Sequence, residues 1–141
     1  MRSLGVLLLA APLLAACTTS SVQDGASSCV GPYLDDQPPS GSFGSPAPTV
    51  RPGQTLTIFG HWYTDTCNDT SADHAPLEPL SPVRLTLRLP GEAALTLGEF
   101  APEGHDMGFA VPIQIPATAS SGIGVVKDDL HHTYRFSIAG A

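Results

Sequence analysis

The sequence predicts an all-β domain, an antiparallel β-sandwich of about seven strands. Short segments alternate between apolar and polar residues, and turn residues separate them. Beyond the N-terminal leader, no segment has the apolar stripe of a helix. The 14 prolines and 14 glycines also disfavour a long helix, because both residues destabilise its interior. The length of 141 residues fits a single domain.

The clearest predicted strand is 83–89, where four apolar residues alternate with arginine and threonine. Pro90-Gly91 follows it and supplies the fixed φ and the positive φ of a type II turn. The pattern therefore predicts a hairpin formed by 83–89 and 94–100. The other predicted strands are 55–59 ending at Gly60, the alternating set Phe109 to Ile115, a short strand with Ile123 and Val125 after Gly122, and 133–139.

Two proline-containing segments are expected to interrupt or border the sheets. Pro112 points outward in the alternating set and cannot donate to a ladder, so its strand is expected to lie at an edge or to be bulged. Residues 35–48 are rich in proline, glycine and serine, and we predict a loop there.

The first 17 residues have the pattern of an export signal. Met1 and Arg2 precede an uncharged stretch over 4–16, which is too short to cross a hydrocarbon core of about 30 Å as a helix. The stretch ends in Leu14-Ala15-Ala16-Cys17. This string resembles the lipobox of bacterial lipoproteins. The resemblance implies diacylglyceryl transfer to Cys17, cleavage before it and often acylation of the new amino group. The alternative is an ordinary cleaved signal followed by a chance cysteine.

These features predict three parts: a signal peptide (1–16), a lipidated flexible tether (17–28) and a sandwich domain (29–141). Removing 1–16 takes away Arg2, which leaves five basic against 13 acidic side chains and a net charge of −8. Such a chain lacks the positive footprint of a nucleic-acid-binding protein. It is also expected to be repelled by anionic lipid head groups, so the lipid anchor would hold it at the extracytoplasmic face of the membrane.

The remaining cysteines are expected to form a disulfide. With Cys17 lipidated, Cys29 and Cys67 are an even pair in an exported chain. Closing the loop between them would stabilise the fold by about 3–4 kcal/mol in the chain-entropy treatment. The alternative is a thiol or metal site, because Cys67 lies among polar residues.

Two stretches resemble immunoglobulin-like domains of bacterial surface proteins. One is Val50 to Gly60, a proline-glycine turn that leads into an early strand. The other is Gly108 to Pro116, followed by Gly122 and a strand. The resemblance implies an immunoglobulin-like sandwich. Trp62 departs from the antibody pattern because it lies shortly before Cys67 and not midway between two cysteines. The predicted disulfide is therefore expected to staple the N-terminal loop to the segment after the early strand.

The aromatic run His61-Trp62-Tyr63 is a candidate ligand platform for a sugar or a partner protein. The alternative places Trp62 in the sandwich core and Tyr63 in solvent.

Metal ligands are a second candidate chemistry. His131 and His132 lie close to Asp128 and Asp129, and His61, His74 and His105 could join them in the fold. Adjacent residues of a strand face opposite sides, so the histidine pair could hold one ion only from a loop. An oxygen-rich stretch that could suit calcium contains Asp65, Asn68, Asp69 and Asp73, but it lacks the spacing of a preformed calcium loop. The alternatives are a polar hairpin loop and a solvated acidic loop.

The sequence contains no phosphate-binding loop, no G-x-G-x-x-G and no G-x-S-x-G. We therefore expect a non-enzymatic envelope lipoprotein without a cofactor, whose module binds an envelope protein or glycan of unknown identity or acts as a structural accessory to envelope machinery. The alternative function is metal or small-ligand binding through the His/Asp loops.

Overall fold

The computed structural model describes residues 30–39, 41, 46–65 and 76–140. Within these residues the chain forms strands, turns and loops and contains no helix. The predicted all-β class is therefore confirmed. The strands are β1 (Tyr33–Asp35), β2 (Thr49–Val50), β3 (Thr55–His61), β4 (Val83–Arg88), β5 (Leu95–Phe100), β6 (Phe109–Gln114), β7 (Gly122–Asp128) and β8 (Thr133–Ile138).

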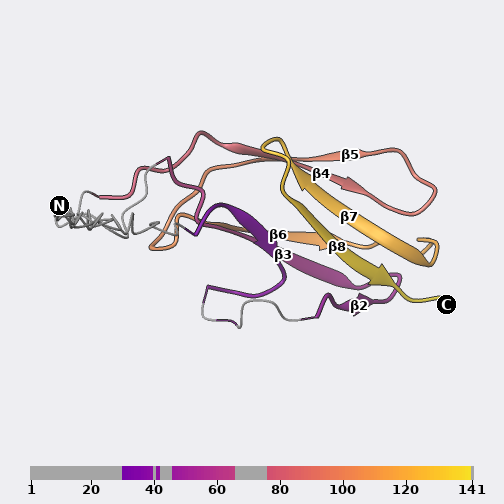
Figure 1. Ribbon diagram of the computed structural model, residues 1–141. Coiled ribbons are helices and arrows are strands. Elements are labelled where there is room, and N and C mark those ends of the chain that lie inside the picture. Colours follow the sequence, from indigo (N-terminus) through magenta and orange to yellow (C-terminus); the bar gives the residue numbers. More distant parts are fainter. Residues whose placement is uncertain (1–29, 40, 42–45, 66–75, 141) are drawn as a thin grey trace, which may run out of the picture.

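Two sheets face each other and form the predicted sandwich (Figure 1). The smaller sheet has the order β1-β3-β6, and the larger sheet has the order β2-β8-β7-β4-β5. Every neighbouring pair is antiparallel except β2 and β8, which run parallel. The sequence did not predict β1 and β2, because strands of three and two residues are too short to show an alternation.

The core lies between the two sheets and is built from alternate residues of their strands. The smaller sheet contributes Ile58 and Val111, and the larger sheet contributes Leu85, Val126 and Phe136, all of them buried. Burying one such side chain stabilises the fold by about 1.5–3 kcal/mol. The outward residues between them are polar or half-exposed, as expected for a sandwich with one solvated face on each sheet.

The predicted hairpin is confirmed as β4 and β5. The Glu92 N–H donates to the Leu89 carbonyl at 3.1 Å, and Gly91 has φ 75°, so the turn has the hydrogen bond and the positive φ expected of Pro90-Gly91. The register shifts after Leu85, which leaves Leu97 as an extra residue in β5. Such a bulge is common in an edge strand such as β5.

Strand β6 lies at the edge of the smaller sheet, and Pro112 points to solvent from it, as the sequence predicts. Phe109 at its start pairs with Gly60 of β3. A Cβ at position 60 would lie 2.3 Å from the Phe109 ring. Glycine is therefore required at Gly60 so that this ring can pack across the strand.

Strand β7 is longer than predicted and buries residues other than its predicted apolar pair. Its core face consists of Gly124, Val126 and Asp128, whereas the Ile123 side chain is 51% exposed. The Phe136 ring of β8 fills the space above Gly124, where a Cβ would come within 2.3 Å of it. The neighbouring aromatic ring thus takes the place of the side chain that β7 lacks.

Candidate functional site

Two polar clusters lie where β3 ends, and each contains one residue of the predicted ligand platform. The first, the His61 cluster, consists of Asp35, Gln37, His61 and Asp106. The second, the Asp128 cluster, consists of Tyr63, Asp128 and His132. The fold thus connects the end of β3 to carboxylates from distant parts of the chain.

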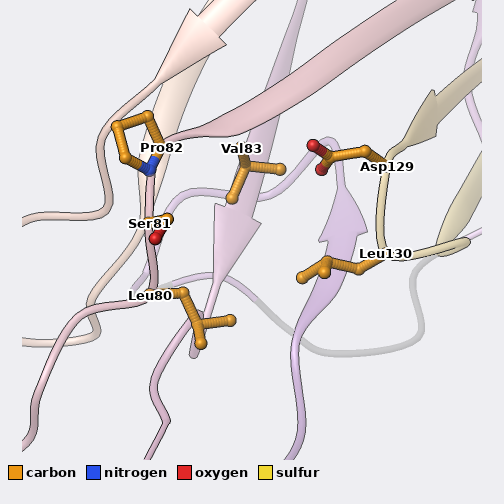
Figure 2. Close-up of a pocket in the computed structure, with 6 residues that line it drawn as sticks. All are labelled: Leu80, Ser81, Pro82, Val83, Asp129 and Leu130. Atoms are coloured by element: carbon orange, nitrogen blue, oxygen red, sulfur yellow. The ribbon is translucent and has the colours of Figure 1, made fainter.

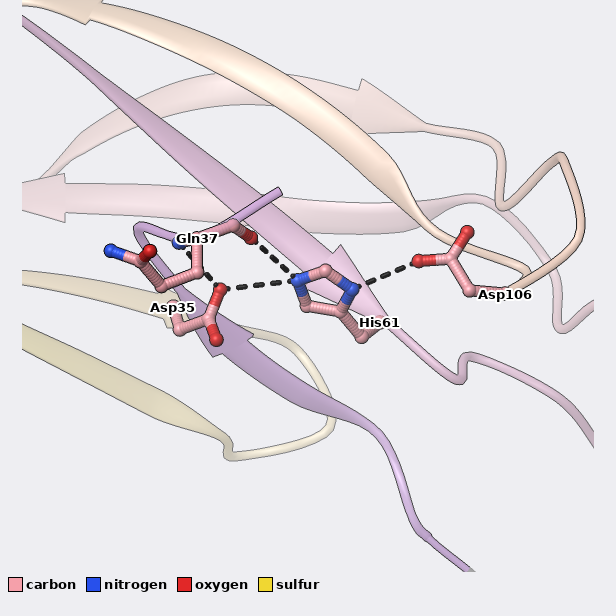
Figure 3. Close-up of polar contacts among 4 residues, drawn as sticks. All are labelled: Asp35, Gln37, His61 and Asp106. Atoms are coloured by element: carbon pink, nitrogen blue, oxygen red, sulfur yellow. Dashed lines mark hydrogen bonds and ion pairs between the residues drawn. The ribbon is translucent and has the colours of Figure 1, made fainter. Parts of the chain in front are cut away.

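In the His61 cluster, the imidazole ring is held between two carboxylates (Figure 3). His61 is 3% exposed. Its Nδ1 lies 2.9 Å from Asp106 Oδ2, and its Nε2 lies 3.1 Å from Asp35 Oδ1 and 3.0 Å from the Gln37 carbonyl oxygen. The Tyr33 ring stacks on the imidazole, with the ring centroids 4.9 Å apart. The contacts join β1 and the segment after it, the end of β3 and the β5–β6 loop.

The oxygens around His61 limit which ring protons the contacts can accommodate. With both aspartates ionised, the oxygens around His61 are all acceptors, so each ring nitrogen must carry a proton to satisfy them. A neutral imidazole has only one N–H and would leave one of these short contacts without a hydrogen. With a proton on each ring nitrogen, all three contacts become hydrogen bonds to the oxygens, and the bridge between the two carboxylates, whose side chains are each 16% exposed, would then be charge-assisted.

Trp62 turns the chain between the two clusters. It has φ 57°, in the left-handed region, and its N–H donates to the Asp106 carbonyl at 2.8 Å. The left-handed residue interrupts the alternation of β3, so the next side chain, Tyr63, enters the core and is 0% exposed, while Trp62 is half-buried. The expectation that Trp62 fills the core and Tyr63 faces solvent is wrong, because it assumed that a regular strand continues through this position.

In the Asp128 cluster, a buried carboxylate accepts three hydrogen bonds. Asp128 ends β7 and is 3% exposed. The Tyr63 hydroxyl donates to its Oδ2 at 2.7 Å, and the His132 backbone N–H donates to its Oδ1 at 2.7 Å. His132 Nδ1 lies 2.7 Å from the same Oδ2. A buried carboxylate is tolerated when donors surround it in this way, and the cluster connects the β7–β8 turn to the end of β3.

The environment of Tyr63 keeps its hydroxyl protonated. Burial raises the pKa of Tyr63 far above its ordinary value, and the hydrogen bond to Asp128 and the charge of that carboxylate raise it further. The hydroxyl is therefore a donor across the physiological range and cannot act as a base.

The pair Asp128–His132 has the arrangement that orients a histidine for general-base chemistry, and the His132 side chain is 34% exposed. In nucleophilic catalysis of the triad type, a hydroxyl or thiol lies at the other ring nitrogen. In the part of the chain that the structure describes, no serine, threonine or cysteine side chain bonds to His132. The contacts present are those of a structural connection between β3, β7 and β8.

Among residues 30–39, 41, 46–65 and 76–140, no three His, Cys, Asp or Glu side chains are arranged to hold a metal ion. His132 Nδ1 faces Asp128, and His131 and His105 are exposed. Asp65 of the predicted calcium stretch is also exposed. Its other members, Asn68, Asp69 and Asp73, lie outside the described residues together with His74, so that part of the metal hypothesis stays a prediction.

The three cysteines lie outside the described residues. Lipidation of Cys17 and the disulfide between Cys29 and Cys67 stay predictions. Thr64 and Asp65, which precede Cys67, lie close to the segment before β4, because Thr64 bridges to Pro79 and the Asp65 N–H donates to the Glu78 carbonyl at 3.0 Å.

A surface pocket lies between the segment before β4 and the β7–β8 turn (Figure 2). Leu80 and Leu130 face each other across it. The Asp129 carboxylate at its rim accepts a hydrogen bond from the Arg84 backbone N–H at 3.3 Å. The pocket is lined by Leu80, Ser81, Pro82, Val83, Asp129 and Leu130. It is largely apolar and does not adjoin the His61 cluster.

No protein-family model matches the chain, and no curated protein matches it. No helix in the described part of the chain is long and apolar enough to cross a membrane.

Proposed function

We propose that the chain is an exported bacterial lipoprotein, anchored through lipid on Cys17, whose immunoglobulin-like sandwich binds an envelope protein or glycan without catalysing a reaction. The observation that carries this proposal is Leu14-Ala15-Ala16-Cys17 at the end of a short uncharged leader. Two acyl chains hold a protein at a membrane durably, because each buried CH₂ contributes about 0.8 kcal/mol.

The strand order supports the immunoglobulin-like assignment. One sheet of an immunoglobulin domain contains the B and E strands, and the other contains G, F and C, extended by C′ in variable-type domains. Here β3 pairs with β6, and the larger sheet runs β8-β7-β4-β5. The same chain order of strands and the same division between sheets are obtained if β3 to β8 are the strands B, C, C′, E, F and G.

The internal hydrogen bonds of the buried ionisable groups support a non-catalytic role. The buried groups His61 and Asp128 are each held by several internal hydrogen bonds, and their partners come from segments far apart in the sequence. Groups held in this way connect loops and sheets. Trp62, which the left-handed turn moves out of the core, is the member of the aromatic run best placed to touch a partner.

The anchor is tested by producing the full chain and its Cys17→Ser variant in a bacterial host fed an alkyne-tagged fatty acid. We expect label on the wild-type chain and its recovery in the detergent phase after phase separation, with both lost in Cys17→Ser. Equal behaviour of the two proteins would contradict lipidation.

The binding role is tested by affinity capture from native envelopes with the intact protein as bait. Trp62→Ala examines the aromatic platform, and Leu95→Ala is the control because it removes an exposed large apolar side chain of β5, outside the run. We expect a specific envelope protein or glycan to be captured by the wild type and lost with Trp62→Ala. Turnover of a captured molecule by the wild-type protein would contradict the non-catalytic part of the proposal.

A further inference from the structure

The positive charges of this acidic chain gather on one face of the sandwich. Beyond residue 16 the sequence has five basic side chains, and four of them belong to β4, β7 and β8. These four point away from the core on the outer face of the larger sheet, namely Arg84, Arg88, Lys127 and Arg135.

The register brings three of these cations together. Arg88 of β4 pairs with Val125 of β7, which in turn pairs with Arg135 of β8. Lys127 lies two residues further along β7, so it is a diagonal neighbour of both arginines. Adjacent strands are about 4.8 Å apart, and diagonal neighbours are about 7–8 Å apart. Arg88, Lys127 and Arg135 therefore form a basic triangle around Val125, which we call the basic face.

In the part of the chain that the structure describes, no acidic side chain forms an ion pair with the basic face. The fourth cation, Arg84, is neutralised, because its guanidinium bonds to Glu99 at 2.7 Å and Asp129 lies beside it. Within the described residues, Arg88, Lys127 and Arg135 make no ion pair. Like charges on neighbouring strands destabilise a sheet. Among the acidic side chains that the structure describes, none forms an ion pair with these three cations, so an anion from outside this part of the fold is the natural partner.

Three acidic side chains lie in the other layer of the sandwich. Asp35, Asp36 and Asp106 belong to the smaller sheet and its loops, in the opposite layer of the sandwich. Packed sheets are about 10 Å apart, and the Debye length at physiological ionic strength is about 8 Å. The electrostatic potential at the basic face is therefore set by the nearby cations and not by the net charge of the chain.

We propose that the basic face docks onto anionic phospholipid head groups and lays the larger sheet against the membrane. Three features favour a membrane over other polyanions. The exposed strands present a broad sheet surface, Thr133 and Ser137 can hydrogen-bond to phosphate oxygens, and the half-exposed side chain of Ile123 can enter the apolar edge of the head-group region.

The covalent reach of the chain permits this contact. Twelve residues lie between Cys17 and Val30, the first described residue, and the thirteen Cα-to-Cα steps can span at most roughly 45 Å. A domain of this size is roughly 30 Å across. This proposal rests on the proposed function in one respect, which is that lipid on Cys17 would bring the larger sheet near the membrane.

The experiment measures binding to lipid vesicles without the anchor, so it distinguishes this proposal from the anchored function. The full chain carrying Cys17→Ser is mixed with vesicles of phosphatidylcholine alone or with about one-third phosphatidylglycerol, and bound protein is measured by sedimentation. Arg135→Gln is compared with Arg51→Gln, which removes the same charge from the exposed turn after β2. The triple variant Arg88→Gln/Lys127→Gln/Arg135→Gln removes the whole basic face.

We expect selective binding to the anionic vesicles that falls roughly fivefold with Arg135→Gln and about a hundredfold with the triple variant. Arg51→Gln should change it by less than about twofold, because this charge lies off the face. At 1 M salt, where the Debye length is about 3 Å, binding should disappear. The urea midpoint of the triple variant should be equal to or higher than that of the wild type, because the changed side chains are exposed and their mutual repulsion is removed.

Three results would overturn the proposal. The first is equal binding of the wild type to both kinds of vesicle, and the second is an equal loss with Arg51→Gln and Arg135→Gln. The third is binding to a soluble polyphosphate chain, or to a second copy of the protein, in the absence of binding to anionic vesicles.

Discussion

The His61 cluster and the Asp128 cluster place a buried ionisable group at the same end of the sandwich in opposite ways. In the first, a base lies between two acids on the outer side of the smaller sheet. In the second, an acid lies inside the fold and receives three hydrogen bonds. The central groups are buried to the same extent, but the Asp35 and Asp106 carboxylates reach water, whereas the Tyr63 hydroxyl does not.

This difference shows that the exposure of the partners, and not of the central group alone, sets what the cluster contributes. When a central group is removed, partners at the surface can bond to water, but partners in the core are left unsatisfied. The Asp128 cluster should therefore contribute more to the free energy of unfolding than the His61 cluster. Four measurements compare the contributions of these polar contacts.

The largest effect is expected for Asp128→Ala, which leaves the Tyr63 hydroxyl buried without an acceptor and releases the β7–β8 turn. Breaking a buried charged network in this way costs about 3–5 kcal/mol in the free energy of unfolding. Urea denaturation measures it, and Asp129→Ala, which removes the exposed neighbouring carboxylate, is the control. An equal loss in both variants would show that the buried contacts contribute nothing special.

The second effect is expected for His61→Leu, which removes the donor shared by Asp35 and Asp106. Because both carboxylates can bond to water, we expect a smaller loss of about 1–3 kcal/mol in the free energy of unfolding. His105→Leu, at an exposed histidine of the β5–β6 loop, is the control. A loss larger than that of Asp128→Ala would reverse the ranking of the two clusters.

The third effect is expected for Tyr63→Phe and depends on pH. Loss of one buried hydrogen bond should lower the free energy of unfolding by about 1 kcal/mol at neutral pH. Above pH 10 the unfolded chain loses tyrosine protons that the folded chain keeps, because burial raises the pKa of Tyr33, Tyr63 and Tyr134. Stability therefore falls as pH rises, by up to about 1.4 kcal/mol per pH unit for each such tyrosine.

Tyr63→Phe removes one of these groups, so its alkaline decline should be shallower than that of the wild type. Urea denaturation between pH 9 and 11 measures both slopes. Parallel declines would mean that Tyr63 ionises in the folded protein as it does in the unfolded one, against the role assigned to the Asp128 cluster.

The smallest effect is expected for Glu99→Gln. This substitution breaks the ion pair between Glu99 and Arg84. Both side chains of the pair are more than half exposed. Exposed pairs contribute little, because solvent screens them. The urea midpoint should stay within the error of the measurement, so this variant is the reference against which the losses in the other variants are compared. A shift comparable to that of His61→Leu would show that burial does not order these polar contacts.

Much of the fold could be predicted from local patterns, but the two clusters could not. The period-2 segments and Pro90-Gly91 predict β4, β5 and their turn, because alternation and turn chemistry are properties of neighbouring residues. The partners of His61, by contrast, are 26 and 45 residues away, and no spacing rule connects them. The sequence singled out His131, His132 and Asp128 as possible metal ligands. It did not predict that His132 would instead hydrogen-bond to Asp128 within the β7–β8 turn.

The prediction of how the Trp62 and Tyr63 side chains are oriented was wrong for a related reason. A left-handed residue other than glycine is uncommon and costs about 1–2 kcal/mol, so a sequence pattern gives no reason to expect it. Here the hydrogen bonds to the Asp106 and Met107 carbonyls hold Trp62 and Tyr63 in place. These bonds exist only after the β5–β6 loop has packed against the end of β3.

The sequence by itself determined that this chain is all-β and where its main strands and the β4–β5 turn lie, and the resemblance of its first 17 residues to a lipidated export signal stays a prediction. The sequence also determined a strongly negative net charge. Only the tertiary structure decided which face carries the positive side chains and which ionisable groups are buried together. The physical reason is that alternation and turns act over a few residues, whereas strand register and loop packing bring together residues tens of positions apart.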